Sequence, residues 1–282
     1  MSLFRHRRLV DRLGRGLCGL ATLLALVPLV SVLVWLVSHG ARGLSFALFT
    51  ELPKPFGEVG GGVGQALLGT GIMVGVALLL SMPLGILAGI ALAEGGKSRF
   101  VQIVRFVADV LAGAPSIAVG VFVYTAVVMP MHGFSAFAGA LALAVLMLPT
   151  ITRSTEELLR LVPIHLREAG LALGLPAWRV TLSVTLKSAL PGVATGIMLA
   201  VARAAGETAP LLFTAFGSQY WAWNLSEPMA ALPLQIFTLA SSPFEAWHQQ
   251  AWAAALVLVT LVLLANLGAR FVTRRARGGM AL

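Results

Sequence analysis

The sequence predicts an all-α polytopic membrane protein with six transmembrane helices, and three observations lead to this fold class. Hydrophobic residues make up 58% of the 282 residues and charged residues only 11%, whereas a soluble domain carries roughly 25% charged residues. Several apolar runs of about 20 residues are long enough to span a bilayer as helices. Basic residues gather between these runs on alternate sides, as in multi-span membrane proteins.

The apolar runs give the expected helices in chain order. Pro83 falls inside the second span and should kink it, because proline removes a backbone hydrogen bond. His132 and Gly133 leave a very short turn between the third and fourth spans, and an external loop is expected before the sixth span. The six spans are expected near Leu17–Val37, Val63–Ala93, Phe106–Met129, Phe134–Thr152, Ala189–Phe216 and Trp252–Val272.

The distribution of basic residues predicts the topology. Only two Lys or Arg residues, Arg42 and Lys54, fall in the loops expected on one side. Seventeen fall in the segments expected on the other side, which are 1–16, 94–105, 153–188 and 270–282. Because loops rich in Lys and Arg stay in the cytoplasm, both termini are predicted to be cytoplasmic.

The net charge of +9 follows from this topology and from the attraction of basic segments to lipid headgroups, so no nucleic-acid partner is predicted. The single cysteine, Cys18, allows no internal disulfide. We expect four parts: a basic cytoplasmic segment at 1–16, a first helix with its external loop at 17–62, a five-helix membrane domain at 63–272 and a basic cytoplasmic tail at 273–282.

Small residues in the second span predict close helix packing. Gly71 and Gly75 are four residues apart, and so are Gly85 and Gly89. Small residues at this spacing let two helix backbones approach closely within a membrane. The pattern therefore predicts a packed bundle, although it carries no information on a substrate.

The longest cytoplasmic loop, 153–188, is expected to form short helices. Ser154 followed by Glu157 is typical of a capping box, which predicts that a helix begins there. A second helix is expected at Ile164–Leu173 and should end at Gly174, since glycine readily adopts a left-handed conformation. Pro176 suits the first turn of a third helix. One face of the second helix should be small and mildly apolar and should fit a groove on a partner; it comprises Leu166, Ala169, Gly170 and Leu173.

Charged residues within the predicted spans are candidates for function, because a charge in the bilayer interior is costly. Arg203 and Glu207 are four residues apart in the fifth span and so share a helix face. They can be explained as an ion pair that holds helices together, or as an anion path in which the planar guanidinium meets oxyanion oxygens. Thr208 would add a hydroxyl, and Pro210 would open the helix backbone nearby.

Asp109, early in the third span, is the other candidate. It follows Arg105 by four residues, a spacing that allows an ion pair on one helix face. A capping or pairing role near the cytoplasmic interface is the simpler hypothesis, and a place in the solute path is the alternative.

The cytoplasmic loop resembles the EAA loop of ATP-binding-cassette (ABC) importer permeases, in which Glu-Ala-Ala is followed after three residues by glycine. The matching residues are Glu168, Ala169, Gly170 and Gly174, with Gly170 in place of the second alanine. Lys187 also stands where that family usually has proline. The resemblance implies the fold of a type I, MetI-like importer permease, whose loop inserts into a cleft of a separate ATPase subunit and couples ATP hydrolysis to transport.

A second resemblance covers nearly the whole chain. The segments Ala202–Thr214, Leu111–Ser116 and Met229–Phe237 resemble the phosphate-specific, PstA-type branch of these permeases. This resemblance implies a subunit of an inorganic phosphate importer in the cell inner membrane, with Arg203 and Glu207 at positions implicated in phosphate passage. It also implies a PstC-type second permease, a PstB-type ATPase dimer that binds ATP and Mg²⁺, and an extracytoplasmic PstS-type phosphate-binding protein as partners.

Other classes of protein fit the sequence less well. Gly96-Lys97-Ser98 ends like a phosphate-binding loop, but Ala91 replaces the glycine that this motif requires, so ATP hydrolysis is assigned to a partner and no cofactor to this chain. The five histidines show no metal-ligand spacing, so neither an enzyme nor a metal site is predicted. The alternatives are an ion-coupled secondary transporter, which does not need a coupling loop, and an ABC permease for sulfate, molybdate or phosphonate.

Overall fold

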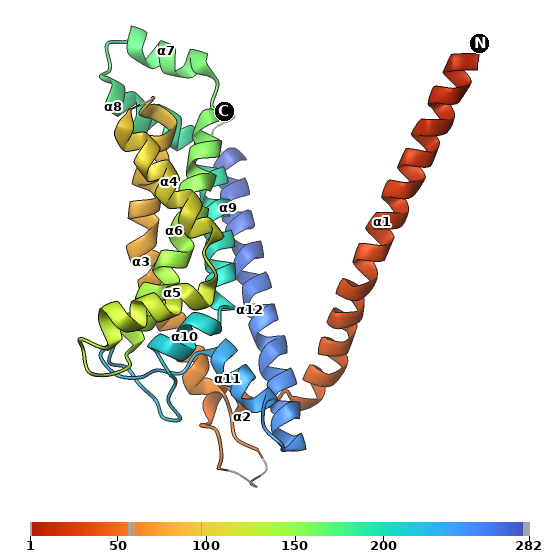
Figure 1. The fold of residues 1–282 in the computed structure, drawn as a ribbon, viewed down its shortest axis with the longest axis vertical. Coiled ribbons are helices and arrows are strands. Elements are labelled where there is room, and N and C mark those ends of the chain that lie inside the picture. Colours follow the sequence, from red (N-terminus) through yellow and green to blue (C-terminus); the bar gives the residue numbers. More distant parts are fainter. Residues whose placement is uncertain (1, 56–57, 59, 97, 279–282) are drawn as a thin grey trace.

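The chain forms a helical bundle in the computed structural model, which describes residues 2–55, 58, 60–96 and 98–278 (Figure 1). Lys97 and the end of the predicted basic tail, 279–282, lie outside these residues. No β-strand occurs in the described part of the chain. The helices are α1 (Ser2–Gly40), α2 (Phe46–Thr50), α3 (Gly64–Glu94), α4 (Arg99–Gly113), α5 (Ser116–Val123), α6 (Ala136–Arg160), α7 (Ile164–Ala172), α8 (Ala177–Val180), α9 (Leu186–Ala205), α10 (Ala209–Thr214), α11 (Leu232–Ala240) and α12 (Glu245–Gly278).

The number of membrane-spanning segments matches the predicted six when the bent pair α4 and α5 is counted as one span. Five helical segments in the described residues are long and apolar enough to cross a membrane, and there are six if the bent pair α4 and α5 forms one span. The all-α, multi-span fold class is therefore confirmed. The five segments are Val10–Gly43, Gly64–Glu94, Ala136–Arg160, Ala177–Ala205 and Glu245–Gly268.

The third span is not one helix, which corrects the prediction for Phe106–Met129. α4 and α5 meet at an angle of 107°. Ala114 and Pro115 both have extended backbone angles between the two helices. Proline disfavours a helical conformation at the preceding residue, so the Gly113-Ala114-Pro115 sequence breaks the span.

The fourth span also differs from its prediction. α6 continues without interruption to Arg160, so the expected helix start at Ser154 is wrong. The Ser154 hydroxyl instead donates to the carbonyl of Thr150, one turn earlier in the same helix. A polar segment that was expected in the cytoplasmic loop is therefore the last part of a long helix.

The centre of the bundle is the contact between α3 and α6. A Cβ at Gly85 would lie 2.7 Å from Ile151 Cγ2, and a Cβ at Gly89 would lie 2.5 Å from Thr155 Cβ. Only glycine allows this approach, so the predicted packing role of Gly85 and Gly89 is confirmed. The same prediction for Gly71 and Gly75 is wrong, because nothing in the described residues lies within 4 Å of either Cβ position. Met147 and Leu143 of α6 are almost fully buried against the α3 side of the core.

Two further elements were not expected from the sequence. The fifth membrane segment begins at Ala177 and passes through a π-helical turn, Thr181–Thr185, into α9. The predicted external loop before the sixth span contains α11, which has a proline in its first turn.

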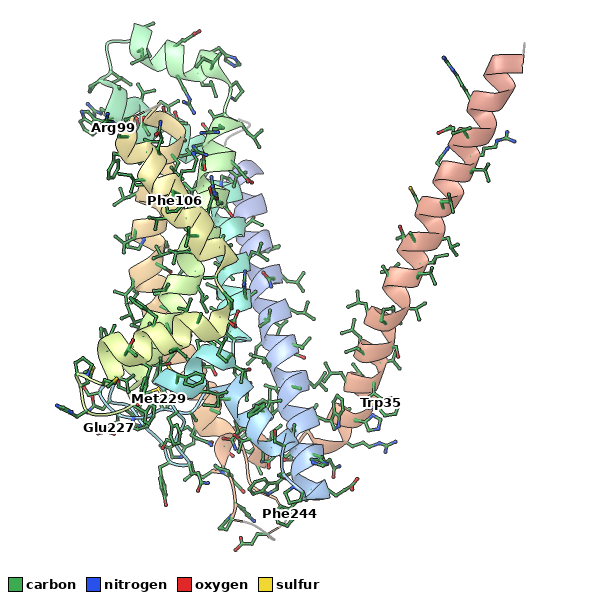
Figure 2. The ribbon with its side chains drawn as sticks, in the orientation of Figure 1. Trp35, Arg99, Phe106, Glu227, Met229 and Phe244 are labelled. Carbon is green, nitrogen blue, oxygen red and sulfur yellow. The ribbon has the colours of Figure 1, made fainter. Side chains whose placement is uncertain are left out.

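The helix α1 diverges from the bundle and contacts it only near its C-terminal end (Figure 1). There Gly40 packs against Leu256 of α12, and the ring of His39 lies 5.9 Å from that of Trp252. Most apolar side chains along α1 are exposed, and Figure 2 shows Trp35 at its contacting end. The described N-terminal end of α1 and the C-terminal end of α12 lie at the same end of the molecule as α7.

Candidate functional site

The fifth span is interrupted where its charged residues lie. α9 ends at Ala205 and α10 begins at Ala209, so residues 206–208 connect two helices. Pro210 stands in the first turn of α10, where its missing N–H removes no helical hydrogen bond. The predicted opening of the backbone near Pro210 is confirmed, whereas the predicted continuation of one span to Phe216 is wrong.

Arg203 and Glu207 lie at this break and form a loose ion pair. Arg203 Nε is 3.5 Å from Glu207 Oε1, and the two side chains are 58% and 16% exposed. This distance is at the outer limit of a hydrogen bond. A guanidinium carries five N–H donors, and no other ion pair to Arg203 occurs among the described residues. Most of these donors therefore remain open to an oxyanion.

The surroundings of the break hold it in place. The Glu207 N–H donates to the Ala204 carbonyl at 3.2 Å, and the backbone carbonyl of the half-buried Thr208 accepts from the Leu211 N–H at 3.1 Å. A Cβ at Gly120 of α5 would lie 2.7 Å from the Cα of Pro210. α5 thus packs directly on the start of α10, so the broken third span supports the broken fifth span.

Asp109 belongs to a different cluster from Arg203, Glu207 and Thr208. Asp109 has the pairing role of the simpler hypothesis, but its partner is Arg153 of α6 and not Arg105. Arg105 pairs instead with Glu156 at 2.7 Å. Asp109 is 58% exposed and lies on the outer edge of this cluster.

Glu156 is the centre of that cluster and was not among the predicted site residues. Its side chain is 3% exposed and lies 2.7 Å from Arg105, 2.7 Å from Arg153 and 2.8 Å from Arg160. Arg160 also donates to the Leu92 carbonyl of α3 at 3.1 Å. A buried carboxylate requires such partners, since an unpaired charge is strongly destabilising. The cluster ties α4, α6 and the end of α3 together.

The spacing of the charged residues in this cluster indicates a shared helix face, but the predicted end of the fourth span left them outside the helix. Arg153, Glu156 and Arg160 are three and four residues apart, which places them on one face of a helix. The predicted fourth span ended at Thr152, so this face was assigned to a loop and a false helix start. A helix boundary placed after Arg160 would have indicated the cluster.

The loop that contains the predicted coupling residues has the expected helix and turn. α7 covers Ile164–Ala172, and Gly174 has a φ of +79°, as predicted. Glu168 and Ala169 are exposed, but Gly170 is buried, and a Cβ there would lie 3.0 Å from Val180 Cγ2 of α8. Only part of the predicted partner-facing surface is therefore available to a partner, since Gly170 packs against the protein's own α8.

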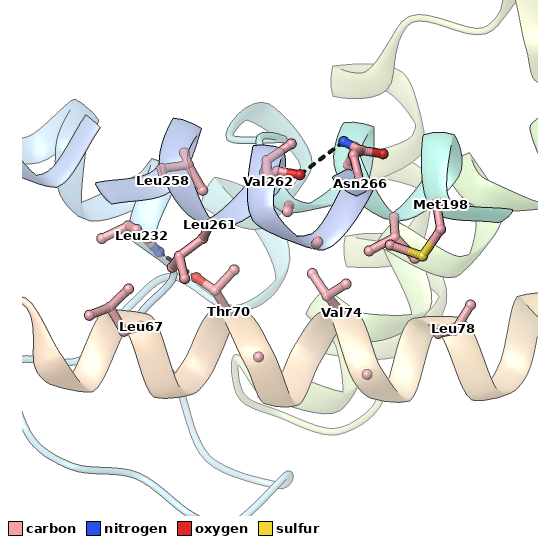
Figure 3. A pocket seen from close by; sticks show the side chains of 16 residues that line it. Leu67, Thr70, Val74, Leu78, Met198, Leu232, Leu258, Leu261, Val262 and Asn266 are labelled. Carbon is pink, nitrogen blue, oxygen red and sulfur yellow. Dashed lines mark hydrogen bonds between the residues drawn. The ribbon is translucent and has the colours of Figure 1, made fainter. Parts of the chain in front are cut away.

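An apolar groove between α3, α9 and α12 is a separate feature (Figure 3). It has a volume of about 330 Å³, and no charged side chain lines it. Its two polar side chains are already paired: the Thr70 hydroxyl accepts from the Leu232 N–H at 2.7 Å, and the Asn266 amide donates to the Val262 carbonyl at 2.9 Å. The groove suits apolar groups in the membrane and offers nothing to hold an oxyanion.

No group of three or more His, Cys, Asp or Glu side chains able to hold a metal occurs within the described ranges. Among the described charged residues, the open pair at the helix break and the closed cluster around Glu156 are the two ion-paired features within the third to fifth spans. An open guanidinium within membrane-spanning helices can contact an anion.

The model of the family described as "Binding-protein-dependent transport system inner membrane component" matches residues 81–278. The chain belongs to this family of importer permeases. Relatives similar to this permease include "Phosphate transport system permease protein PstA" of Yersinia pestis, which is 47% identical over 94% of this chain and 90% of its own length. The protein of the same name from Xylella fastidiosa strain Temecula1 is 48% identical over 97% and 96%.

Solved structures show that the permease has the fold of ABC importer subunits. A chain of the inward-facing MetNI methionine ABC transporter matches with a TM-score of 0.61 and 19% identity over 76% of this chain and 94% of that chain. A chain of an amino acid ABC transporter crystallised with histidines matches with a TM-score of 0.56 and 13% identity. The predicted MetI-like fold is confirmed.

Proposed function

We propose that this chain is a transmembrane permease subunit of an ATP-driven importer of inorganic phosphate. The observation that carries this proposal is its 47–48% identity, over nearly the full chain, to relatives named phosphate transport system permease protein PstA. Family membership makes the chain a transport component and assigns ATP hydrolysis to a separate subunit. ATP and Mg²⁺ are accordingly bound by that ATPase, and no cofactor is assigned to this chain.

The solute path in this proposal passes the break between α9 and α10. Arg203 contacts phosphate through the N–H donors that Glu207 leaves open, since a planar guanidinium binds oxyanions with two parallel hydrogen bonds. Glu207 competes for the same guanidinium, which keeps the anion from binding too tightly to leave. Thr208 lies beside this site and supplies a hydroxyl, whereas Asp109 lies in the separate cluster and has at most an indirect effect on the path.

The general classes of partner follow from the family, and their specific types are inferred from the PstA relatives. An importer permease of this family works with an ATPase and a substrate-binding protein. We assign a PstC-type permease, a PstB-type ATPase dimer and an extracytoplasmic PstS-type phosphate-binding protein, on the strength of the similarity to PstA. The pairing of two permeases would enclose the path between them.

The ATPase contact in this proposal is the exposed end of α7. Glu168 and Ala169 are exposed, and Leu173 is 82% exposed. Gly170 and Gly174 have supporting roles, since Gly170 lets α7 approach Val180 and Gly174 supplies the turn with positive φ. ATP-driven closure of the ATPase moves α7, and the permease alternates between access from the two sides.

The proposed location is the cell inner membrane, with both termini in the cytoplasm. Seventeen Lys and Arg in the segments on one side, against two on the other, support this orientation. The ends of α1 and α12 also lie at the α7 end of the molecule, where an ATPase would dock. The surrounding bilayer covers the exposed apolar side chains of α1.

The test is uptake of labelled phosphate by cells that lack this chain, with and without the restored gene. We expect uptake only with the gene, inhibition by unlabelled phosphate but not by sulfate, molybdate or phosphonate, and loss of uptake when ATP is depleted. Uptake of another oxyanion in place of phosphate would show that the chain belongs to an importer of that oxyanion. Uptake that survives ATP depletion but collapses with the ion gradient would identify an ion-coupled secondary transporter instead.

A further inference from the structure

Arg167 has an environment unlike that of its neighbours in α7. The adjacent Glu168 is exposed, yet the Arg167 side chain is only 18% exposed. Its Nη1 lies 2.8 Å from Glu94 Oε1 and 2.9 Å from Oε2, and its Nη2 donates to the Leu159 carbonyl at 2.8 Å. One guanidinium therefore joins α7 to the last residue of α3 and to the end of α6.

The contact of Arg167 with Glu94 and Leu159 can transmit a movement of α7 to the ends of α3 and α6. Charge-assisted hydrogen bonds are short and directional, and the Glu94 side chain is itself only 28% exposed. Both helix ends that Arg167 holds are C-terminal, where a cation is favoured by the helix dipole. A movement of α7 would therefore pull on α3 and α6, or break the contact.

The ends of α3 and α6 lead directly into the Glu156 cluster. Arg160, one turn beyond Glu156 in α6, donates to the Leu92 carbonyl, two residues before Glu94. Arg160 also pairs with Glu156 at 2.8 Å, and Glu156 pairs with Arg105 of α4 at 2.7 Å. Polar contacts joined by the last turns of α3 and α6 thus connect α7 to α4.

From α4 the connection reaches the candidate phosphate site through packing. α4 joins α5 at the 107° bend, and α5 packs through Gly120 on Pro210 at the start of α10. Glu207 lies in the connection before α10, and Arg203 lies in the last turn of α9. This route through the bent span is independent of the direct covalent route from α7 through α8 into α9.

We propose that Arg167 is a positioning residue for energy coupling, which transmits the movement of α7 through Glu94 and the Glu156 cluster to the bent third span. The inference rests on the proposed function, because it requires an ATPase that acts on α7. The inference adds to the proposed function a second route by which movement of α7 reaches the solute path. The residue that begins this route, Arg167, contacts α3 and α6 and not the exposed surface of α7.

The test is the number of phosphate ions imported per ATP hydrolysed by the full complex in proteoliposomes supplied with loaded binding protein. The variants are Arg167→Gln, Glu94→Gln and the charge reversal Arg167→Glu with Glu94→Arg. The matched control is Arg99→Gln, because Arg99 is exposed at the start of α4 (Figure 2) and has no ion pair among the described residues. ATP hydrolysis and the amount of assembled complex are measured on the same preparations.

We expect both single variants to assemble and hydrolyse ATP but to import about five- to tenfold less phosphate per ATP, within the usual range of allosteric coupling. The charge reversal should recover part of the ratio, and Arg99→Gln should match wild type. If Arg167→Gln fails to assemble, Glu94→Gln carries the test, since it keeps the Arg167 bond to Leu159.

An unchanged ratio in the assembled single variants would overturn the proposal. So would a loss of assembly in both that the charge reversal does not repair, because the pair would then serve stability alone. Wild-type complex that imports no phosphate would contradict the proposed function itself. Wild-type import with an unaffected ratio in the variants would contradict only the role of Arg167.

Discussion

The cluster around Glu156 and the pair at the α9–α10 break both place charges within long apolar helices, but they differ in saturation. Glu156 is 3% exposed and has three arginines within 2.8 Å. Arg203 is 58% exposed and has one carboxylate at 3.5 Å. Glu156 thus has three cationic partners, whereas Arg203 has one distant carboxylate. Saturated charges hold helices in place, and unsaturated charges are available to a ligand.

The backbone is also continuous around the Glu156 cluster and interrupted around the Arg203 pair. The Glu156 cluster lies on the uninterrupted helix α6, where glycines of α3 allow close packing. The Arg203 pair lies where two helices end and begin. A membrane protein tolerates such open backbone where it is buried in protein or lines a polar cavity, which agrees with a solute path.

The largest effect on stability is expected from Glu156→Gln, which breaks the closed cluster. The variant leaves three arginines without their shared carboxylate, so we expect a loss of about 3–5 kcal/mol. Thermal unfolding in detergent and the amount of protein in the membrane measure this effect. The control is Glu157→Gln, since Glu157 is exposed and unpaired among described residues; equal losses in both variants would contradict the account.

A smaller effect is expected from Gly89→Ala, which tests the packing beneath the cluster. The added Cβ would lie 2.5 Å from Thr155 Cβ and 2.8 Å from the Thr152 carbonyl oxygen, so α3 and α6 must separate, at a cost of about 1–3 kcal/mol. Gly75→Ala is the matched control, because nothing lies within 4 Å of its Cβ position. If the unfolding temperatures of the two variants fell equally, the close approach of α3 and α6 at Gly89 would not explain the loss of stability.

The smallest effect is expected from Asp109→Asn, which sharpens the boundary of the closed cluster. Asp109 is 58% exposed, and Arg153 keeps Glu156 as a partner at 2.7 Å, so the loss should be about 0–1 kcal/mol. Phosphate uptake should stay near the wild-type rate. A large loss of uptake with normal unfolding would move Asp109 into the solute path.

The sequence predicted the helical architecture well because apolar length alone defines a membrane span. The turn at Gly174 and the packing role of Gly85 and Gly89 were also predicted, since glycine has a specific steric consequence at each place. The break at Ala114–Pro115 was missed, although the proline that causes it is local. A hydropathy pattern averages over such a residue.

The Glu156 cluster was missed for a different reason. Arg105 and Glu156 are far apart in the sequence, and only the packing of α4 on α6 joins them. Charged residues also end an apolar run, so Arg153 and Glu156 were assigned to a loop when they are the last turns of α6. Arg203 and Glu207, by contrast, are close in sequence and stand out in an apolar run.

The most direct test of the central claim compares wild type, Arg203→Lys and Arg203→Gln in cells that lack this chain, with labelled phosphate uptake and membrane levels measured together. We predict equal levels, a fall in uptake of about ten- to a hundredfold for Arg203→Gln, and an intermediate fall for Arg203→Lys, because lysine keeps the charge without the planar fork. Undiminished uptake by Arg203→Gln at equal levels would contradict the claim and leave Arg203 a packing residue.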